Sequence, residues 1–574
     1  MSFLVHRPSK HSLEAIAISW FKPQDFIGDS TLPNKSKALL GLLLLGAGLL
    51  TGFLLFMHRL GSGGDNLDYL IYIRSLMNGE WDVIKGWRYP PGYPIAAALA
   101  LSVSGMEIPF LLSNLTNEPI YFLHALNIVF FAFAAVVFWL KVENTSTPAW
   151  IPFTAALLWA VNQTSAATAS QIASEPLFLL LSMVALGCWR SATNDPSTRL
   201  GNLLLAMIVT TLCLLTRTAG LAVVATALFM AAWNWRRLEH PWQTLAAAAI
   251  PFFVYAAYVL VTQQTAYMEV MLRGSFGEHE ASQPLVTRLL ANGTVYLRSS
   301  VDLLLPKVMG TYGILDLAGL IFLEVAYGLV ILVLLFIGLI AYIRKHGVTI
   351  GLVYVAATLG MILVQPYREN RYLIPILPFL MIYWLNGLHY AWGFLPKIFG
   401  GKGRWRSFGI AFLALLALWN VAVNGYAGVK NWRNIIMLRH QPAWAPERYI
   451  LSRENDFADF IAASIWLGQH VPTNSIIYSR KPSFTYLASG RHAVPTLTIL
   501  THHDLWREVS QQATQHPVYI INDVFTPGSF YAVTRQRIIE PFLEEYNDHV
   551  IVVHESVQGT TVVEIKPVNS NSER

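Results

Sequence analysis

Cysteine and charged residues are scarce in this sequence. Two cysteines among 574 residues exclude a scaffold held together by disulfides and a cysteine-rich zinc protein. Only 13% of the residues are charged, against roughly 25% in soluble proteins, while 54% are hydrophobic. Together with a mean hydropathy of +0.45, these values exclude a disordered chain and argue against a purely soluble enzyme.

Signatures of nucleotide binding are also absent. The sequence contains neither a Walker loop nor a Rossmann fingerprint, so no nucleotide cofactor is expected. The net charge of +6 is small, and nucleic acid is not expected as a partner. In a membrane protein, such an excess of Lys and Arg usually lies in cytoplasmic loops.

Long apolar runs, by contrast, are frequent. A transmembrane helix needs about 20 mostly apolar residues. The first run, Leu39–Phe56, follows a polar lead and begins too far along the chain for a cleaved signal peptide. We expect eleven transmembrane segments, at 39–56, 120–140, 149–163, 175–189, 201–215, 219–235, 243–262, 319–343, 348–365, 372–391 and 407–425. The sequence therefore predicts an α-helical polytopic membrane protein.

The positions of the basic residues predict the orientation in the membrane. With the N-terminus in the cytoplasm, clusters such as Arg236-Arg237 and Arg344-Lys345 fall on the cytoplasmic side, as the positive-inside rule expects. The reverse orientation would place these clusters outside. We therefore expect a multi-pass protein of the cell inner (plasma) membrane, with a cytoplasmic N-terminus and an extracytoplasmic C-terminal part.

The composition changes at about residue 450, where polar residues become more frequent. Val- and Ile-rich runs then predict strands at 475–478, 518–521, 550–554 and 560–565, with a turn at Gln558-Gly559. This part is long enough to bury a small core of its own. We expect three parts: a cytoplasmic N-terminal segment 1–36, a transmembrane domain 37–449 with outer loops at about 58–118 and 263–318, and an extracytoplasmic α/β domain 450–574.

Two aspartates open the first outer loop. Asp65 and Asp68 follow a glycine-rich stretch, and three residues of separation place them on one face of a helix. One interpretation is helix capping, because Asp near a helix start accepts hydrogen bonds from free N–H groups. The other is that the glycines expose a reactive carboxylate.

The same loop contains an arginine on a stiff turn. Arg88 precedes the run Tyr89-Pro-Pro-Gly-Tyr93-Pro, in which the prolines restrict the backbone. An arginine flanked by aromatic residues can anchor the chain at the lipid headgroups. Alternatively, Arg88 is an anion-binding residue held on a rigid turn.

These motifs resemble a known family. The aspartate after the first span, followed by the run from Arg88 to Pro94, resembles the first luminal loop of membrane glycosyltransferases of the GT-C class. The similar branch contains the protein O-mannosyltransferases and the lipid A aminoarabinose transferases. Further motifs resemble this group in the same order, namely Ala173–Phe178, Thr216–Gly220, Arg371–Pro375, Ser479–Pro482 and Ser489–Arg491. The chain departs from the group at Thr218 and Ala219, where Pro is usual, and at Asp68, where O-mannosyltransferases commonly have Glu.

The resemblance implies a GT-C-like fold and a sugar transfer. A polyprenyl-phosphate-linked sugar would be the donor, and an unknown acceptor (lipid, glycan or protein of the cell envelope) would attack it at the outer face with inversion. Asp65 matches the catalytic position and would take the proton of the acceptor hydroxyl. We expect no cofactor, assign no metal ligands, and expect membrane lipids as the surroundings.

The resemblance also implies residues that bind the substrate. Arginines would stabilise the growing charge on the leaving phosphate. The expected substrate-binding residues are Asp68, Arg88, Tyr93, Glu175, Arg217, Arg371 and Tyr372. Alternatives stay open for two of them, because Arg217 could snorkel to the interface and Arg371 could pair with Glu369.

Two other functions were weighed against an enzyme. A transporter or flippase of a lipid-linked substrate usually has symmetric halves, and no internal repeat is found here. A non-catalytic assembly factor with the same fold is the other alternative. The histidines do not favour a metal enzyme: His279 has no second His at ligand spacing, and His502-His503-Asp504 is interpreted as a surface turn.

Overall fold

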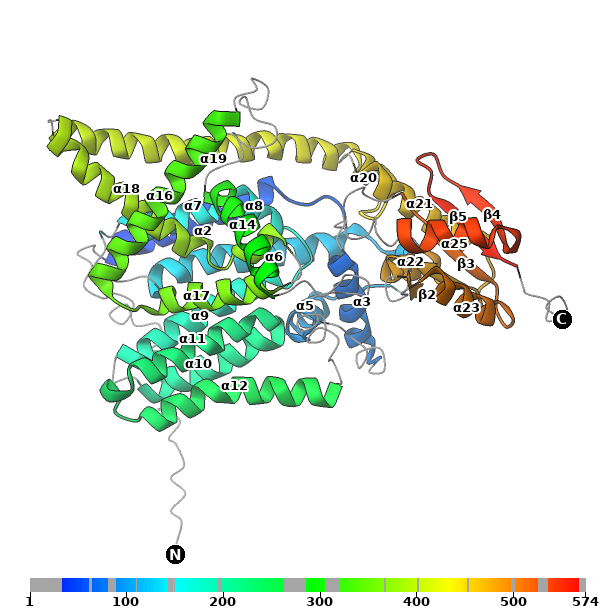
Figure 1. Cartoon of the computed structure of the whole chain (residues 1–574), viewed down its shortest axis with the longest axis horizontal. Coiled ribbons are helices and arrows are strands. Elements are labelled where there is room, and N and C mark those ends of the chain that lie inside the picture. The colour runs from blue at the N-terminus through cyan, green and yellow to red at the C-terminus, as the bar shows by residue number, and fades with distance from the viewer. Residues whose placement is uncertain are drawn as a thin grey trace, which may run out of the picture.

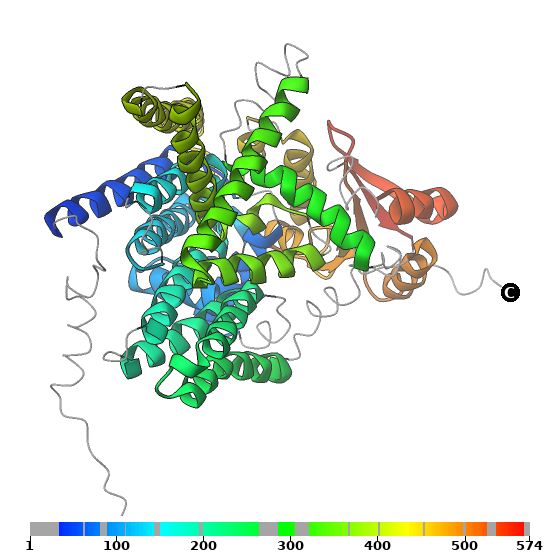
Figure 2. The same ribbon diagram turned by 60° about the vertical axis from the view of Figure 1, so that its left-hand side comes forward.

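The structure of the chain is a computed structural model. It describes residues 34–60, 64–80, 89–109, 111–142, 148, 150–194, 199–262, 285–304, 321–365, 368–399, 402–451, 454–496, 501–524 and 535–566. An assembly of helices occupies the first part of the chain, and a five-stranded sheet with its own helices follows. The sheet lies at one end of the long axis of the molecule, beside the helical assembly (Figure 1). The turned view in Figure 2 shows the same separation.

The helical part follows the apolar runs of the sequence. Its helices are α2 (Asn34–Leu54), α3 (Gly64–Asn78), α5 (Gly92–Val103), α6 (Asn117–Val137), α7 (Trp150–Ala160), α8 (Gln163–Ala169), α9 (Glu175–Asn194), α10 (Arg199–Thr216), α11 (Leu221–Trp233), α12 (Pro241–Thr262), α14 (Leu285–Leu304), α16 (Ile321–His346), α17 (Ile350–Val364), α18 (Leu377–Phe399), α19 (Lys402–Met437) and α20 (Pro446–Ile450). Two short 3₁₀ turns matter for the site, η3 (Thr218–Gly220) and η5 (Asn370–Leu373).

Several helices are suited to a lipid bilayer. Within the described residues, five stretches are long and apolar enough to cross a membrane: Lys35–Leu54, Asn117–Val142, Glu175–Thr193, Pro241–Thr262 and Gly328–His346. Five shorter apolar helices accompany them. The predicted α-helical membrane protein is therefore confirmed, while the number of eleven spans stays a prediction.

A glycine allows the helices α16 and α18 to pack closely. Gly387 of α18 faces Leu334 of α16, and a Cβ atom at Gly387 would lie 1.9 Å from the Leu334 carbonyl oxygen. No other residue fits there without moving the helices apart. Nearby, the edges of aromatic rings fill the interior, as where Phe379 meets Phe138 with ring centres 5.2 Å apart.

The sheet has a mixed topology. Its strands are β1 (Ile476–Ser479), β2 (His492–Pro495), β3 (Val518–Asn522), β4 (Val550–Glu555) and β5 (Thr561–Ile565), in the order β2-β1-β3-β5-β4. β1 pairs with β2 and β3 in parallel, whereas β5 pairs with β3 and β4 in antiparallel fashion. The four predicted strands are confirmed. β2 was not predicted, because its four residues include a histidine and a proline, which carry no strand signal.

The two faces of the sheet are covered differently. The accompanying helices are α21 (Asn455–His470), α22 (Pro482–Ser489), α23 (His502–Ala513) and α25 (Glu540–Glu545). One hydrophobic cluster contains only residues of the C-terminal part, such as Ile520 and Phe542. The other cluster joins Phe457 and Phe484 to residues of the helical part, such as Leu67 and Tyr93. One core is thus shared across the expected domain boundary.

A buried arginine reinforces this junction. Arg448 in α20 is fully buried and donates from Nη1 to the carbonyl oxygen of His58 at 2.5 Å. Its Nη2 donates to the carbonyl oxygens of Leu438 at 2.8 Å and Gln441 at 2.5 Å. The bond to His58 fixes α20 against the segment that leads from α2 into α3, and the other two bonds hold α20 to the segment that follows α19.

Candidate functional site

Glu175 brings two arginines together. It begins α9 and is buried, with 5% of its surface exposed. Its Oε1 lies 2.5 Å from Nη1 of Arg217 and 3.2 Å from Nη1 of Arg371. The folded helices thus gather three residues that are far apart in the sequence.

Tyr372 completes this cluster. The centre of its ring lies 5.9 Å from Cζ of Arg217 and 5.6 Å from Cζ of Arg371. A cation within about 6 Å of an aromatic ring is attracted to the negative face of that ring. Four of the predicted substrate-binding residues therefore lie side by side, and we call them the arginine cluster: Glu175, Arg217, Arg371 and Tyr372.

Arg217 is held by the turn between α10 and α11. Its backbone is extended, its N–H donates to the Cys213 carbonyl at 2.9 Å, and its carbonyl accepts from Gly220 N–H at 2.9 Å. Burial by itself lowers the pKa of Arg217, but the Glu175 carboxylate raises it, and the net direction is upward. The side chain is only 19% exposed and turns to Glu175. The ion pair with Glu175 thus holds the guanidinium inside the protein, and the snorkelling alternative stays a prediction because no membrane interface is defined.

Arg371 has a second carboxylate partner. Its Nε pairs with Glu369, and its Nη2 donates to Glu369 Oε1 at 3.3 Å. The alternative that Arg371 pairs with Glu369 is confirmed, and the bond to Glu175 is added to it. The two carboxylates differ in exposure, since the Glu369 side chain is 45% exposed and that of Glu175 is 7% exposed. Glu369 can therefore move into solvent more easily than Glu175.

The arginine cluster lies at the wall of a cavity. The cavity has a volume of about 580 Å³, part of which is open to solvent. Apolar side chains form much of its lining, including Phe178, Met361 and Ile362. The lining thus brings charged groups and apolar side chains together at one place. The other polar residues that line it are Thr218, Tyr354, Thr358 and Gln365, none of which the sequence analysis selected.

A chain of contacts joins α3 to Arg217. The Tyr69 hydroxyl donates to Ser174 Oγ at 2.8 Å, and Arg217 Nη1 donates to the same oxygen at 3.4 Å. Tyr93 packs its ring edge against Tyr69 at 5.1 Å and accepts from Asn127 Nδ2 at 3.0 Å. Tyr93 is therefore linked to the arginine cluster through Tyr69 and Ser174.

The proline-rich turn and the Arg217 turn touch each other. A Cβ atom at Gly92 would lie 2.7 Å from the Leu215 carbonyl oxygen and 2.7 Å from Thr216 Oγ1. Only glycine permits this approach, which explains its place in the Pro-Pro-Gly-Tyr-Pro run. Arg88 itself lies outside the described residues, four positions before Gly92.

Asp65 and Asp68 both lie in α3. Asp65 belongs to the first turn of this helix, four residues before Tyr69. Asp68 accepts a hydrogen bond from Ser483 Oγ of α22, so its carboxylate contacts the C-terminal part. Ser483 was not selected from the sequence, because its position gives no sign of a partner so distant in the chain.

Of the histidines considered as metal ligands, only His502 and His503 lie in the described part of the chain. His279 lies outside the described residues. His502, His503 and Asp504 form the first turn of α23, with Thr501 as the N-cap whose hydroxyl accepts from Asp504 N–H at 3.0 Å. The expected surface turn is therefore a helix start.

Comparisons with known proteins found a family match over part of the chain and similar solved structures. Residues 72–289 match the family described as Mannosyltransferase (PIG-V). No curated protein matches the chain.

ArnT from Cupriavidus metallidurans, solved with undecaprenyl phosphate, is similar in structure. Its TM-score is 0.48 at 10% identity, and the match covers 91% of this chain and 97% of that chain. An oligosaccharyltransferase from Archaeoglobus fulgidus, tethered with an acceptor peptide, has a TM-score of 0.48 and 13% identity, covering 91% of this chain and 73% of that chain.

The matched residues 72–289 include the Arg88 run, Glu175 and Arg217. The family match confirms the resemblance to membrane glycosyltransferases that the motifs indicated, and with it the prediction of an enzyme that transfers a sugar.

Proposed function

We propose that this chain transfers a sugar from a polyprenyl-phosphate donor to a cell-envelope acceptor at the outer face of the membrane. The observation that carries the proposal is the arginine cluster at the wall of a largely apolar cavity. A polyprenyl phosphate has an anionic head and a long apolar tail, so both parts of the cavity have a matching partner. No observation on the described residues favours a transporter.

The phosphate would bind between Arg217 and Arg371. The charges of the two arginines are at present offset by Glu175 and Glu369. If the half-exposed Glu369 turns away, a net positive charge remains for the phosphate. Glu175 would stay buried and hold both guanidinium groups in place. Arg88 would add a third guanidinium, since its turn is continuous with Gly92, which touches the end of α10.

Asp65 would act as the general base. It would take the proton of the acceptor hydroxyl while that oxygen attacks the anomeric carbon. The bond from this carbon to the phosphate oxygen would break, and the arginines would stabilise the charge on the leaving phosphate. The contacts from Tyr69 through Ser174 to Arg217 support this arrangement, since Asp65 precedes Tyr69 by one helical turn.

The remaining predicted residues would position these groups. Asp68 would orient α3 through Ser483, and Tyr93 would support Tyr69 from behind. Direct contact of Asp68 with the substrate stays a prediction beside this positioning role. Tyr372 would hold the two guanidinium groups near its ring through cation–π attraction.

We also propose the placement of the chain in the membrane. Residues 1–36 would lie in the cytoplasm, 37–449 would form the transmembrane domain, and 450–574 would lie outside as an α/β domain. A reporter active only outside the cytoplasm, fused after Arg574, should be active, and a cytoplasmic reporter should work near Lys402. The opposite pair of results would overturn this topology in the plasma membrane.

The decisive experiment compares cells that carry the parent chain, Asp65→Asn or no chain. Envelope glycolipids and glycans are analysed by mass spectrometry. A sugar modification present only with the parent is the expected result, and purified Asp65→Asn should transfer about 10²–10⁴-fold more slowly. Asp68→Asn should lose less. Identical envelopes in all three strains would contradict the proposed function.

A further inference from the structure

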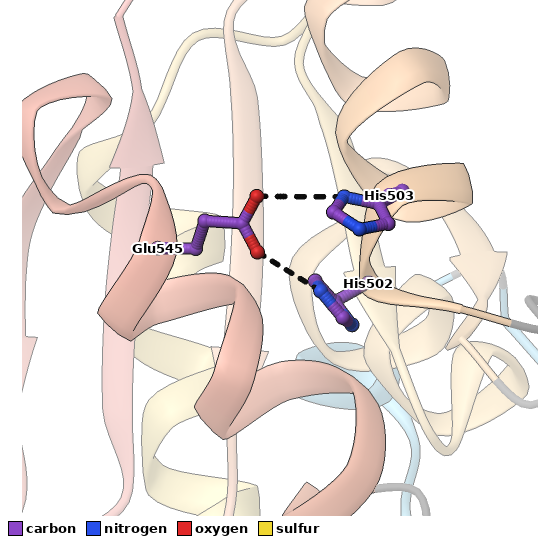
Figure 3. A group of neighbouring side chains, drawn as sticks. All are labelled: His502, His503 and Glu545. Atoms are coloured by element: carbon purple, nitrogen blue, oxygen red, sulfur yellow. Dashed lines mark ion pairs between the residues drawn. The ribbon is translucent and has the colours of Figure 1, made fainter.

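The C-terminal part contains a second group of side chains with possible ligand chemistry. His502 and His503 start α23, and Glu545 ends α25 (Figure 3). His502 Nε2 lies 2.9 Å from Glu545 Oε2, and His503 Nδ1 lies 3.5 Å from Glu545 Oε1. Two separate helices thus direct two imidazole rings and one carboxylate to a single point.

The spacing of these atoms fits a small transition-metal ion. The three donor atoms all lie within 4.8 Å of one another. Zinc binds His nitrogen and carboxylate oxygen at about 2.0–2.1 Å, which in tetrahedral geometry separates neighbouring donors by about 3.3 Å. The distances of 2.9 and 3.5 Å, each to a different oxygen of the Glu545 carboxylate, fall on either side of this value. Two His and one Glu also form a donor set that zinc accepts, with water in the fourth position.

An aromatic stack holds the two helices at this distance. The ring of Trp506 on α23 stacks on Tyr546, directly after Glu545, with centres 4.5 Å apart and planes 9° apart. The two histidine rings lie only 4.1 Å apart, although neighbouring helix positions normally diverge. The stack of Trp506 on Tyr546 therefore holds the three side chains together without a metal ion.

One contact must change when the metal binds. The Tyr546 hydroxyl lies 2.9 Å from His503 Nδ1, the nitrogen that would bind the ion. This hydroxyl can turn to a metal-bound water. Asp504 is engaged elsewhere, because it accepts a hydrogen bond from Arg507 at 2.6 Å, and it is not counted as a ligand.

We propose that His502, His503 and Glu545 form a binding site for a divalent transition-metal ion, with Zn²⁺ as the best fit. The bound ion would join α23 to α25 and stabilise this face of the sheet. The site is separate from the arginine cluster, so the proposal does not depend on the proposed function.

The test uses the full chain, purified without a histidine tag and treated with a chelator. Calorimetric titration with Zn²⁺ should show one saturable site that His502→Ala and Glu545→Gln each weaken by more than about tenfold. His516→Ala, which removes a histidine just beyond the other end of α23, should bind Zn²⁺ like the parent. Added Zn²⁺ should raise the melting temperature of the parent and of His516→Ala only.

A second measurement guards against misfolded variants. Co²⁺ in place of Zn²⁺ should give visible absorption bands in the parent, and these should change in His503→Ala while the melting temperature without metal stays the same. The proposal is overturned if the parent shows no saturable binding. It is equally overturned if His502→Ala and Glu545→Gln bind Zn²⁺ as tightly as the parent.

Discussion

Single residues decide the chemistry of this chain, and Arg217 is the clearest case. Its guanidinium meets the buried Glu175 and faces the cavity. Lysine would keep the charge but lose the two parallel N–H groups that match a phosphate. We expect Arg217→Ala to lower turnover by about 10²–10³-fold, and Arg217→Lys to restore only part of it. Turnover against donor concentration measures this, with the exposed Arg237→Lys as the control. Parent-like kinetics in Arg217→Lys would remove Arg217 from the phosphate site.

A second residue, His58, makes stability depend on pH. Burial, together with Arg59 and Arg448, lowers the pKa of His58 to about 4. The unfolded chain takes up this proton near pH 6.5, whereas the folded chain does so only near pH 4, so the unfolded state binds more protons between these values. Stability should therefore fall by up to about 3 kcal/mol as the pH falls through this window. Melting curves at pH 7 and pH 5 test this, and His58→Gln should show a smaller difference than the parent.

The sequence indicated all four residues of the arginine cluster but not its surroundings. Glu175, Arg217 and Arg371-Tyr372 were found because each lies in a short motif that resembles one family. Their mutual contacts could not be derived, because nothing local in the chain relates the start of α9 to η5. Ser483 was missed for the same reason, since its bond to Asp68 depends on how two distant helices dock.

At the scale of single elements, the contact of α22 with α3 carries a testable consequence. Ser483 donates to Asp68, three residues after Asp65. Without this bond, α3 can shift relative to the arginine cluster, and a displacement of about 1 Å can cost up to about 10²-fold in rate. We expect Ser483→Ala to lower kcat while the melting temperature changes little. Ser510→Ala on α23 is the matched control, and equal kcat in both variants would show that α22 does not position α3.

The elements themselves were predicted best where the apolar pattern is long. The apolar runs at 243–262 and 348–365 correspond closely to α12 and α17. The run at 407–425 lies within α19, which continues to Met437 because no proline interrupts it. Its polar residues Asn420 and Asn424 are largely buried, so they do not end the helix. Asn424 donates to the Val161 carbonyl oxygen at 2.7 Å.

At the scale of the whole molecule, the C-terminal part contributes to two hydrophobic clusters, and only one of them belongs to it alone. Residues 450–574 expressed by themselves keep the cluster around Ile520 and Phe542 but expose Phe457 and Phe484 of the shared cluster. We expect this fragment to melt cooperatively, at a clearly lower temperature than the same part in the full chain. Calorimetry of fragment and full chain tests this. An unchanged melting temperature would mean that the shared cluster adds no stability to the C-terminal part.

The length of α19 determines the distance between its first residues and the C-terminal part. Its 36 residues rise about 54 Å, whereas the hydrocarbon core of a bilayer is about 30 Å thick. The helix runs along one edge of the molecule to the neighbourhood of α20 and the sheet (Figure 1). The length of α19 therefore determines how far the sheet lies from the end of the helix near Lys402. One added turn would move its far end by about 5.4 Å, more than the whole length of a hydrogen bond. The hydrogen bond from Ser483 to Asp68 thus depends on the number of residues in α19, a helix to which neither residue belongs.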